Sequence, residues 1–274
     1  MKWIDLTPPE FRAAVRDCGL CVLPVGSLER HGEHGYFGTD GVIAETLAVK
    51  AAELEPAVVF PVWWFGQVHE ASCFEGAINF PPEMLISMLR QLLNQIAKNG
   101  FRKICILNAH GGNHHWLQFF DMALLDEPRD YTLYLLDPRS GLNKQEKEKI
   151  AAVWETEPNH GAESETSISM AGAPGRVRLE QQPFAEPIRP MNRMEHLPGV
   201  SSGLWWYADY PENVTGCPSL ASQEKGQAVM EVEIHAIARV LRTIKQDTVL
   251  PALREEFYRK SCRPLKPTAE DQRR

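Results

Sequence analysis

Three short segments of the chain are rich in side chains that bind metal ions. The first contains Glu29 and His31, and Asp40 follows nine residues after that histidine. Residues two apart in an extended segment point the same way, so Glu29 and His31 can both face one ion. Asp40 alone could be an ordinary helix-capping carboxylate. Its position close to a glutamate and two histidines, among glycines, favours a metal site instead.

The second segment, residues 108–113, places His110 beside a pair of glycines. A single histidine is commonly structural, but glycines let the backbone approach an ion or substrate and leave the imidazole uncrowded. His110 is therefore a candidate ligand. His114 and His115 follow within a helical pattern and point about 100° apart, so at most one could face the site. Neither is included in the predicted site.

The third segment, residues 160–167, contains His160 and two glutamates. If a helix begins near Ala162, Glu163 and Glu165 diverge by about 200°, so only one of them can face a metal ion. Taken alone, this segment could be a capped acidic helix start. Three such clusters in one chain favour a common metal site.

Alternating apolar strands and amphipathic helices must position these segments. We predict strands over residues 19–25, 57–62, 102–107 and 131–136, and helices over about 39–54, 82–98, 113–125, 144–154 and 222–246. Near-continuously apolar strands that alternate with helices predict a three-layer α/β/α fold with a mostly parallel central sheet. Ligands of such sheets bind at the carboxyl ends of the strands. The first two metal-binding segments directly follow predicted strands.

We expect one domain over residues 1–274. Between about residues 173 and 203, five prolines interrupt the periodicity. They predict a long irregular excursion of the kind that forms lids or subunit contacts. The polar tail over about residues 264–274 is expected to be frayed.

The composition excludes several classes of protein. The 274 residues are 43% hydrophobic and 24% charged, which is enough apolar side chain for a core and argues against a disordered or fibrous chain. The net charge is -7 and no Lys/Arg cluster stands out, so nucleic acid is not an expected partner. No run approaches the roughly 18 apolar residues of a membrane helix, and the N-terminus is too polar for a signal peptide. We therefore expect a cytoplasmic protein without a membrane partner.

Two further motifs suggest other chemistry but lack the required context. Cys18 and Cys21 form a CxxC pair, yet no second Cys or His pair stands at zinc-finger spacing. Ser201 lies in a G-x-S-x-G motif, which would indicate a serine hydrolase if a strand preceded it and a helix followed. A proline precedes the motif and an irregular region surrounds it. Both readings are kept only as alternatives.

Together, the three metal-binding segments resemble the creatininase family of metal-dependent amidohydrolases. The family's pattern is close to P-V-G-S-x-E-x-H-G-x-H with a later T-D or V-D, then N-G-H-G-G-N, then H-A-G-x-x-E-T-S. Here the three parts stand at residues 24–34 with 39–40, at 108–113, and at 160–167. Ala109 replaces one glycine, and Gly161-Ala162 replaces Ala-Gly. His69 with the segment 74–78 resembles a fourth family stretch, H-x-x-F-x-G-T.

The resemblance implies a centre of two divalent metal ions per subunit. Carried over by motif, Glu29 and His110 would bind one ion, His31 the other, and Asp40 would bridge them. Glu165 is the candidate that completes the second ion's ligands. Creatininase itself has a glutamate where this chain has Gly112. That difference argues against creatinine as the substrate.

The family's chemistry implies a role for His160 and a class of substrate. Two ions of Zn, Mn or Fe would hold a water, lower its pKa and stabilise the oxyanion formed when a C–N amide bond is cleaved. His160 would be the catalytic proton shuttle. The substrate would be a small molecule such as a cyclic amide or a formamide, bound by residues that stay unknown. Family members form oligomers, so a homo-oligomer, a hexamer by resemblance, is expected. A non-catalytic metal-binding or ligand-binding protein is the alternative.

Overall fold

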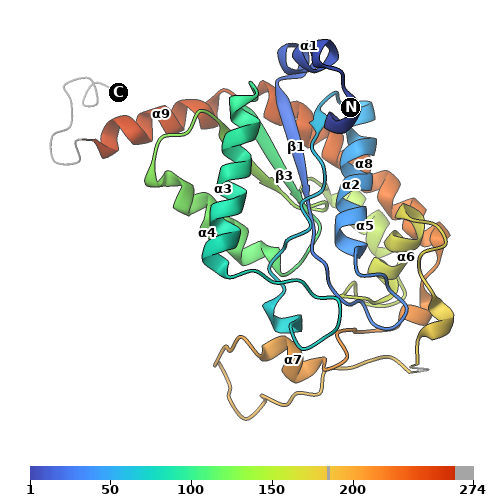
Figure 1. The fold of residues 1–274 in the computed structure, drawn as a ribbon. Coiled ribbons are helices and arrows are strands. Elements are labelled where there is room, and N and C mark those ends of the chain that lie inside the picture. Colours follow the sequence, from blue (N-terminus) through green and yellow to red (C-terminus); the bar gives the residue numbers. More distant parts are fainter. Residues whose placement is uncertain (184–185, 263–274) are drawn as a thin grey trace.

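A four-stranded parallel sheet forms the centre of the computed structural model, which describes residues 1–183 and 186–262 (Figure 1). The strands lie in the order β2-β1-β3-β4 and are β1 (Leu20–Val25), β2 (Val58–Val59), β3 (Lys103–Asn108) and β4 (Thr132–Leu136). Val25 is paired with Asn108, so β1 and β3 end at the same edge of the sheet. The predicted parallel sheet is confirmed.

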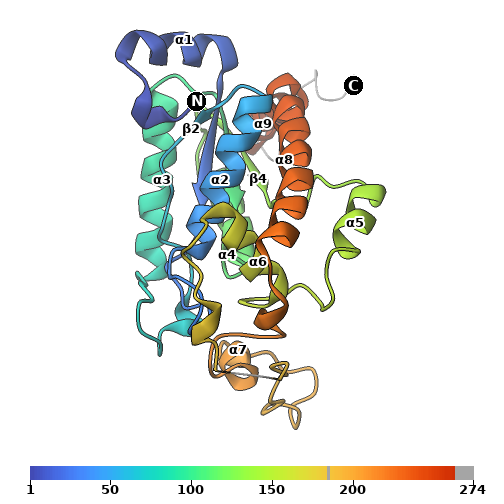
Figure 2. The same cartoon turned by 90° about the vertical axis from the view of Figure 1, so that its right-hand side faces the viewer.

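Helices cover both faces of the sheet, which completes the predicted three layers (Figure 2). One face packs against α2 (Thr39–Leu54), α5 (Lys144–Ala151), α6 (Glu163–Gly172) and α8 (Gln223–Gln246). The other packs against α1 (Pro8–Cys18), α3 (Pro82–Lys98) and α4 (Asn113–Ala123). Single-turn 3-10 helices occur at Trp3–Asp5, His69–Ala71, Leu124–Asp126, Leu179–Gln181 and Pro218–Leu220.

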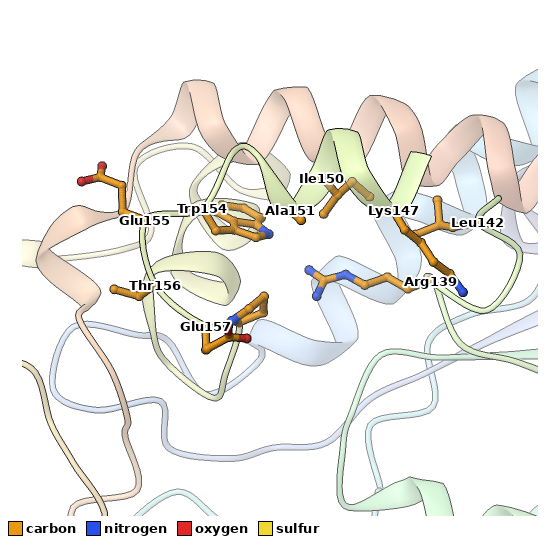
Figure 3. Close-up of a pocket in the computed structure, with 10 residues that line it drawn as sticks. Arg139, Leu142, Lys147, Ile150, Ala151, Trp154, Glu155, Thr156 and Glu157 are labelled. Carbon is orange, nitrogen blue, oxygen red and sulfur yellow. The ribbon is translucent and has the colours of Figure 1, made fainter. Parts of the chain in front are cut away.

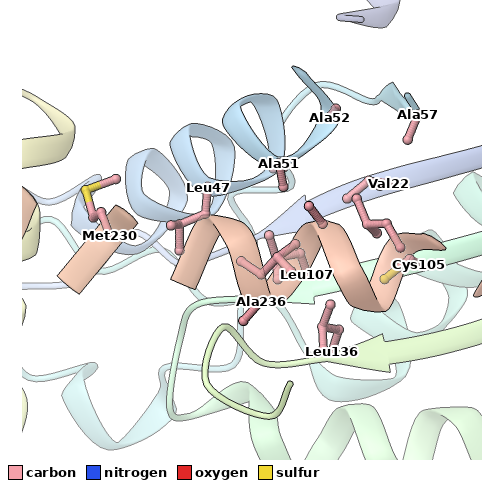
Figure 4. Close-up of a cluster of buried hydrophobic side chains, with 14 of the residues drawn as sticks. Val22, Leu47, Ala51, Ala52, Ala57, Cys105, Leu107, Leu136, Met230 and Ala236 are labelled. Carbon is pink, nitrogen blue, oxygen red and sulfur yellow. The ribbon is translucent and has the colours of Figure 1, made fainter. Parts of the chain in front are cut away.

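The strands are apolar throughout because both of their faces are buried. In β1, Leu20 and Val22 face the core under α2 and α8, whereas Cys21 and Leu23 face the core under α3. This alternation is the period of two that a strand imposes. Figure 4 shows the first core, in which Leu47 of α2 packs with side chains of the sheet and α8. Buried apolar strands fix the sheet, and with it the place where each strand ends.

Three elements are shorter than predicted. The second strand is shorter than residues 57–62, because Pro61 has no N–H to donate and only isolated bonds, such as Phe60 N–H to Val22 O, continue the pairing. The helix predicted to reach residue 125 ends at Ala123 in a 3-10 turn, and the helix predicted to reach residue 154 ends at Ala151. The helix predicted over residues 222–246 is confirmed, and its N-cap is Ser222, whose side chain accepts from the Lys225 N–H.

Three helices were not predicted, one of which is the short helix α7 (Trp205–Asp209), in a region expected to be irregular. The other two are longer. The first is α1, whose capping box joins Thr7 and Glu10. The second is α9 (Val249–Ser261), which has no buried residue and therefore lacks the core-facing stripe that sequence patterns reveal. The tail predicted to fray, residues 264–274, lies outside the described residues.

The Pro-rich excursion lies beyond the carboxyl ends of the strands, together with the short helix α7 (Trp205–Asp209) (Figure 1). Within its described part it contains only one single-turn helix, Leu179–Gln181, as its composition predicted. It is therefore on the same side of the molecule as the metal-binding segments. Among the described residues, no helix combines the length and the apolar composition needed to cross a membrane.

Candidate metal centre

The candidate site forms where the order of the strands reverses, between the ends of β1 and β3. Glu29 and His31 lie in the loop after β1, and His110 lies in the loop after β3. Asp40 stands in the first turn of α2, and Glu165 in the first turn of α6. The topological switch point of a parallel sheet is the usual place for a ligand. All five predicted metal ligands meet there.

Asp40 is the centre of the cluster because each of its oxygens faces a different histidine. Its Oδ1 lies 3.1 Å from His31 Nε2, and its Oδ2 lies 2.9 Å from His110 Nδ1. Glu29 Oε2 is 3.2 Å from the same nitrogen of His110, and Glu165 Oε2 is 3.5 Å from the same nitrogen of His31. Two three-residue groups therefore share Asp40, and the ligand atoms of each group lie within 4.8 Å of one another.

Backbone carbonyls fix the orientation of both histidines. The Nδ1–H of His31 donates to Glu29 O at 3.1 Å, and the Nε2–H of His110 donates to Gln67 O at 2.7 Å. Each ring therefore turns its other nitrogen toward the carboxylates. Metal-binding histidines typically hold their second N–H in this way.

A close approach of β1 and α2 places Asp40. A Cβ at Gly26 would lie 2.3 Å from Gly41 N, so only glycine permits this contact. The neighbouring Ser27 hydroxyl then donates to Asp40 Oδ2 at 2.6 Å. These contacts explain why a Gly-Ser pair stands at the end of β1.

The charges of the cluster compensate one another. Burial raises the pKa of Asp40, but the facing charges of His31 and His110 hold it well below its usual range. Burial lowers the pKa of both histidines, but the facing carboxylates outweigh it and raise the pKa of each well above its usual value. Glu29 Oε2 is buried and accepts no hydrogen bond, although buried acceptors normally have a donor. Such a group of carboxylates fits divalent cations, and its mixed nitrogen and oxygen donors suit Zn, Mn or Fe.

The two glutamates of α6 point in different directions. Glu163 accepts from the Lys225 ammonium at 2.6 Å and from the Thr156 N–H at 2.8 Å, on the side of α8. Glu165 faces His31, and its Oε2 also accepts from the Gly161 N–H at 2.7 Å. Of the pair, Glu165 is the one that the structure brings to the cluster.

Gly112 leaves no room for a side chain on the opposite side of the cluster. A Cβ at this position would lie 2.5 Å from His110 Nε2 and 2.6 Å from the backbone oxygen of Gln67. A glutamate here would therefore require the backbone around Gln67 to move. This crowding agrees with Glu165 being the acid beside His31.

His160 lies at the open side of the cluster. Its Nε2–H donates to Arg30 O at 3.1 Å, which leaves Nδ1 facing Glu165 Oε2 at 3.6 Å. Its ring is 4.3 Å from the ring of His31. The side chains of His160 and Glu165 are 16% and 21% exposed, against 1% for Asp40. These two groups are thus the ones that a molecule entering from outside meets.

A cavity of about 590 Å³ borders the cluster at His110 and Glu165. Both His114 and His115 line it, although neither belongs to the candidate metal groups of the described residues. The remaining lining carries both polar and apolar residues and comes mainly from the loops after β3 and β4 and from the start of α6. The cluster therefore has a neighbouring space large enough for a small molecule.

Comparison with known proteins agrees with the geometry. The family model described as creatinine amidohydrolase matches residues 4–241. The chain belongs to the creatininase family. It is therefore a hydrolase of the amidohydrolase type, as its motifs predicted.

Two curated proteins of this family illustrate its range. The chain is 25% identical over 262 residues to 3-dehydro-scyllo-inosose hydrolase of Thermotoga maritima, covering 88% of this chain and 82% of that protein. It is also 25% identical over 258 residues to the creatinine amidohydrolase of Pseudomonas putida, covering 85% of this chain and 92% of that protein. Hydrolysis of a small molecule is common to both names, and the substrates differ.

Solved creatininase structures share the fold. A crystal structure of creatinine amidohydrolase has a TM-score of 0.75 at 22% identity, covering 90% of this chain and 98% of that one. A manganese form of creatininase has a TM-score of 0.74 at 22% identity, covering 90% and 99%. A mutant creatininase of the Zn-Zn type also has a TM-score of 0.74, at 21% identity, covering 90% and 98%.

Asn213 is a site residue that the sequence did not reveal. It is fully buried with a left-handed φ of 51°, a conformation that Asn tolerates better than most residues. Its Nδ2 donates to Glu29 Oε1 at 3.1 Å and to Arg30 O at 2.6 Å, and its Oδ1 accepts from Trp206 Nε1 at 2.5 Å. It orients Glu29 from a segment far along the chain, where no nearby motif marked it.

The other sequence candidates lie elsewhere or have structural partners. His34 Nε2 contacts Gly161 O and Thr166 Oγ1, and burial lowers its pKa to about 4. His69 is exposed. Cys18 and Cys21 are buried in the core, and no candidate metal group of the described residues contains a cysteine. Ser201 is exposed, and no strand of the described residues ends directly before it, so the context of a nucleophile elbow is missing.

The raised pKa values of His31 and His110 predict that metal binding releases protons. In protein freed of metal by a chelator, both rings are protonated at neutral pH, and each must lose a proton before it can coordinate. About two protons per chain should be released on loading, and affinity should fall as the pH falls. Calorimetric titration in buffers of different ionisation enthalpy measures this number. Loading without proton release would show that the histidines are not ligands.

The divergence of the two glutamates predicts unequal effects on metal binding. Glu165→Gln should weaken the second ion selectively and leave about one tightly held metal per chain. Glu163→Gln, the matched control, should leave two, although loss of its Lys225 pair should lower the melting temperature. A graded metal titration of both variants tests this. If Glu163→Gln empties the site instead, the assignment of Glu165 is wrong.

Proposed function

We propose that this creatininase-family hydrolase uses two divalent metal ions to cleave the C–N bond of a small amide, such as a cyclic amide or a formamide. The observation that carries the proposal is the position of Asp40, whose two oxygens face the histidines of two different ligand groups. A carboxylate shared in this way suits two adjacent ions. The solved creatininases with Mn and of the Zn-Zn type support the same choice of metals.

The proposed ligands divide into two sets around Asp40. Glu29 and His110 Nδ1 would hold one ion, and His31 Nε2 and Glu165 would hold the other. Two such ions together would lower the pKa of a water molecule toward neutrality and polarise a substrate carbonyl. Asn213 and Ser27 donate to Glu29 and Asp40, so these carboxylates are held in place before substrate arrives.

His160 is the proposed proton shuttle. The Arg30 carbonyl holds its Nε2–H, so Nδ1 is the atom that can accept and return a proton on the side of Glu165. Its partial exposure lets it reach the nitrogen of a leaving group. His160 also lies within 4.8 Å of Glu29 and His31 ligand atoms, so metal analysis must accompany its mutation.

The substrate class rests on the cavity beside the cluster. A space of about 590 Å³ whose walls carry both polar and apolar residues accommodates a small molecule. Gly112, which crowding keeps free of a side chain, argues against creatinine as that molecule.

Two further parts of the proposal concern assembly and the alternative function. Large apolar side chains are exposed on the excursion and α7, among them Met191, Leu204 and Trp205, which supports a homo-oligomer. A metal-binding protein without catalysis is the second candidate. The partly exposed His160, which directly follows Asn159 of the cavity lining, favours catalysis over it.

Asp40→Asn tests the two-metal proposal. The variant keeps the size of the side chain and an acceptor for Ser27, but it loses the charge that both ligand groups share. Hydrolysis should be abolished and metal content should drop in parallel, with an unchanged circular dichroism spectrum. His110→Ala should behave in the same way. Full activity in either purified variant, with two ions still bound per chain, would refute the proposal.

His160→Ala separates proton transfer from metal binding. Because the residue is proposed to move a proton, the variant should retain its metal ions and lose turnover by roughly 10²–10⁴-fold, the usual contribution of a general acid or base. Metal analysis and a screen of small cyclic amides and formamides give the two readouts. Loss of metal from the variant would make His160 a ligand instead.

A further inference from the structure

A second cavity, of about 610 Å³, adjoins the cavity beside the metal cluster (Figure 3). Arg139 and Pro158 line both spaces, so the two meet at these residues. The second cavity is formed by the loop after β4, by α5 and by the segment that leads to His160. The two cavities are therefore neighbours.

Arg139 is held so that the end of its guanidinium stays available. Its Nε donates to Glu233 Oε1 at 2.9 Å, and Glu233 is buried in α8 with a side chain only 2% exposed. Arg139 itself is 40% exposed. Within the described residues, no hydrogen bond or ion pair occupies its two Nη groups. A guanidinium fixed through Nε presents a planar pair of donors, the geometry that binds a carboxylate with two parallel hydrogen bonds.

Trp154 supplies a second donor without a partner. Its Nε1 is buried and makes no hydrogen bond, whereas buried donors normally have an acceptor. Figure 3 shows the Arg139 guanidinium directed toward Trp154, with Glu155 turned away from them. The Glu155 carboxylate is already paired with Lys225 at 2.8 Å. The other acid of the lining, Glu157, is exposed to solvent.

We propose that the second cavity binds a carboxylate group of the substrate, through the Nη groups of Arg139 and the indole N–H of Trp154. The proposal rests on the proposed function, because the scissile amide would lie in the first cavity. Leu142 and Ile150 give the second cavity an apolar wall for the part of the molecule that joins the two groups. The substrate would thus be an amide with a carboxylate at the end remote from the bond that is cleaved. A phosphate fits less well, because Glu155 and Glu157 also line the cavity.

The test compares an acid with its neutral amide. The probes are 4-fluorophenylacetate and 4-fluorophenylacetamide, and ¹⁹F relaxation measures their binding to metal-loaded and to chelator-treated protein. The acid should bind about tenfold more tightly than the amide, in line with charge-assisted hydrogen bonds. Both forms of the protein should show this preference. Equal binding of the two probes, or a preference that disappears with the metals, would overturn the proposal.

Variants test whether the acid binds at Arg139. Arg139→Met with Glu233→Gln removes the pair without leaving a buried charge, and it should abolish the preference for the acid. The matched control is Arg242→Met with Glu55→Gln, a pair joined through the same Nε at 2.8 Å but remote from both cavities. It should keep the preference. Retention of the preference in the Arg139 double variant would also overturn the proposal.

A milder variant covers the case in which the double variant fails to fold. Trp154→Phe removes the indole N–H and keeps an aromatic wall. It should therefore weaken binding of the acid several-fold and leave binding of the amide unchanged. An unchanged affinity for the acid in this variant would contradict the role of Trp154 and refute the site as proposed. These measurements follow binding alone. Loss of the carboxylate site would thus leave the Asp40→Asn result intact, and failure of the two-metal proposal would leave the acid preference intact.

Discussion

The structure depends on burying two carboxylates and two imidazoles at the end of a parallel sheet, with a third, partly exposed carboxylate beside them. Isolated, each carboxylate would pay a large desolvation penalty, and removal of any partner would leave an uncompensated charge. Asp40 meets this constraint by facing a different histidine with each oxygen. Backbone carbonyls then hold the outer nitrogens of both rings. Positive charge at this point, from protons or from metal ions, is what allows the strand ends and the helix starts to converge.

The sheet positions the ligand-bearing loops accurately enough for such a cluster to form. The loops that carry Glu29 and His110 leave two strands that are paired residue by residue up to Val25 and Asn108. Asp40 is placed by the contact of Gly26 with Gly41, a backbone approach that no other residue type permits. The helix α6 adds Glu165 from the far side, packed on α8 and α2. Local rigidity of this kind holds a catalytic group within a fraction of an ångström of the position that the reaction requires.

The sequence predicts the part of the site that is encoded in local motifs. Strand ends followed by glycines and paired ligand types identified the loops of Glu29 and His110, and helix periodicity alone showed that Glu163 and Glu165 diverge. The family resemblance then singled out Glu165. Asn213 could not be found in this way, since its role arises from a turn 184 residues away from Glu29. Gln67 contributes only a backbone oxygen, which carries no side-chain signal. Likewise, α9 went unpredicted because it buries no residue.

The hydrogen-bonded chain from Trp206 through Asn213 to Glu29 joins α7 directly to a candidate ligand. Thermodynamic linkage is reciprocal, so whatever favours one position of α7 must alter the free energy of ion binding, and ion binding must bias α7 by the same amount. The segment that leads into α7 carries exposed apolar side chains. Neighbouring molecules that cover those side chains would therefore tune the affinity of the centre without touching it.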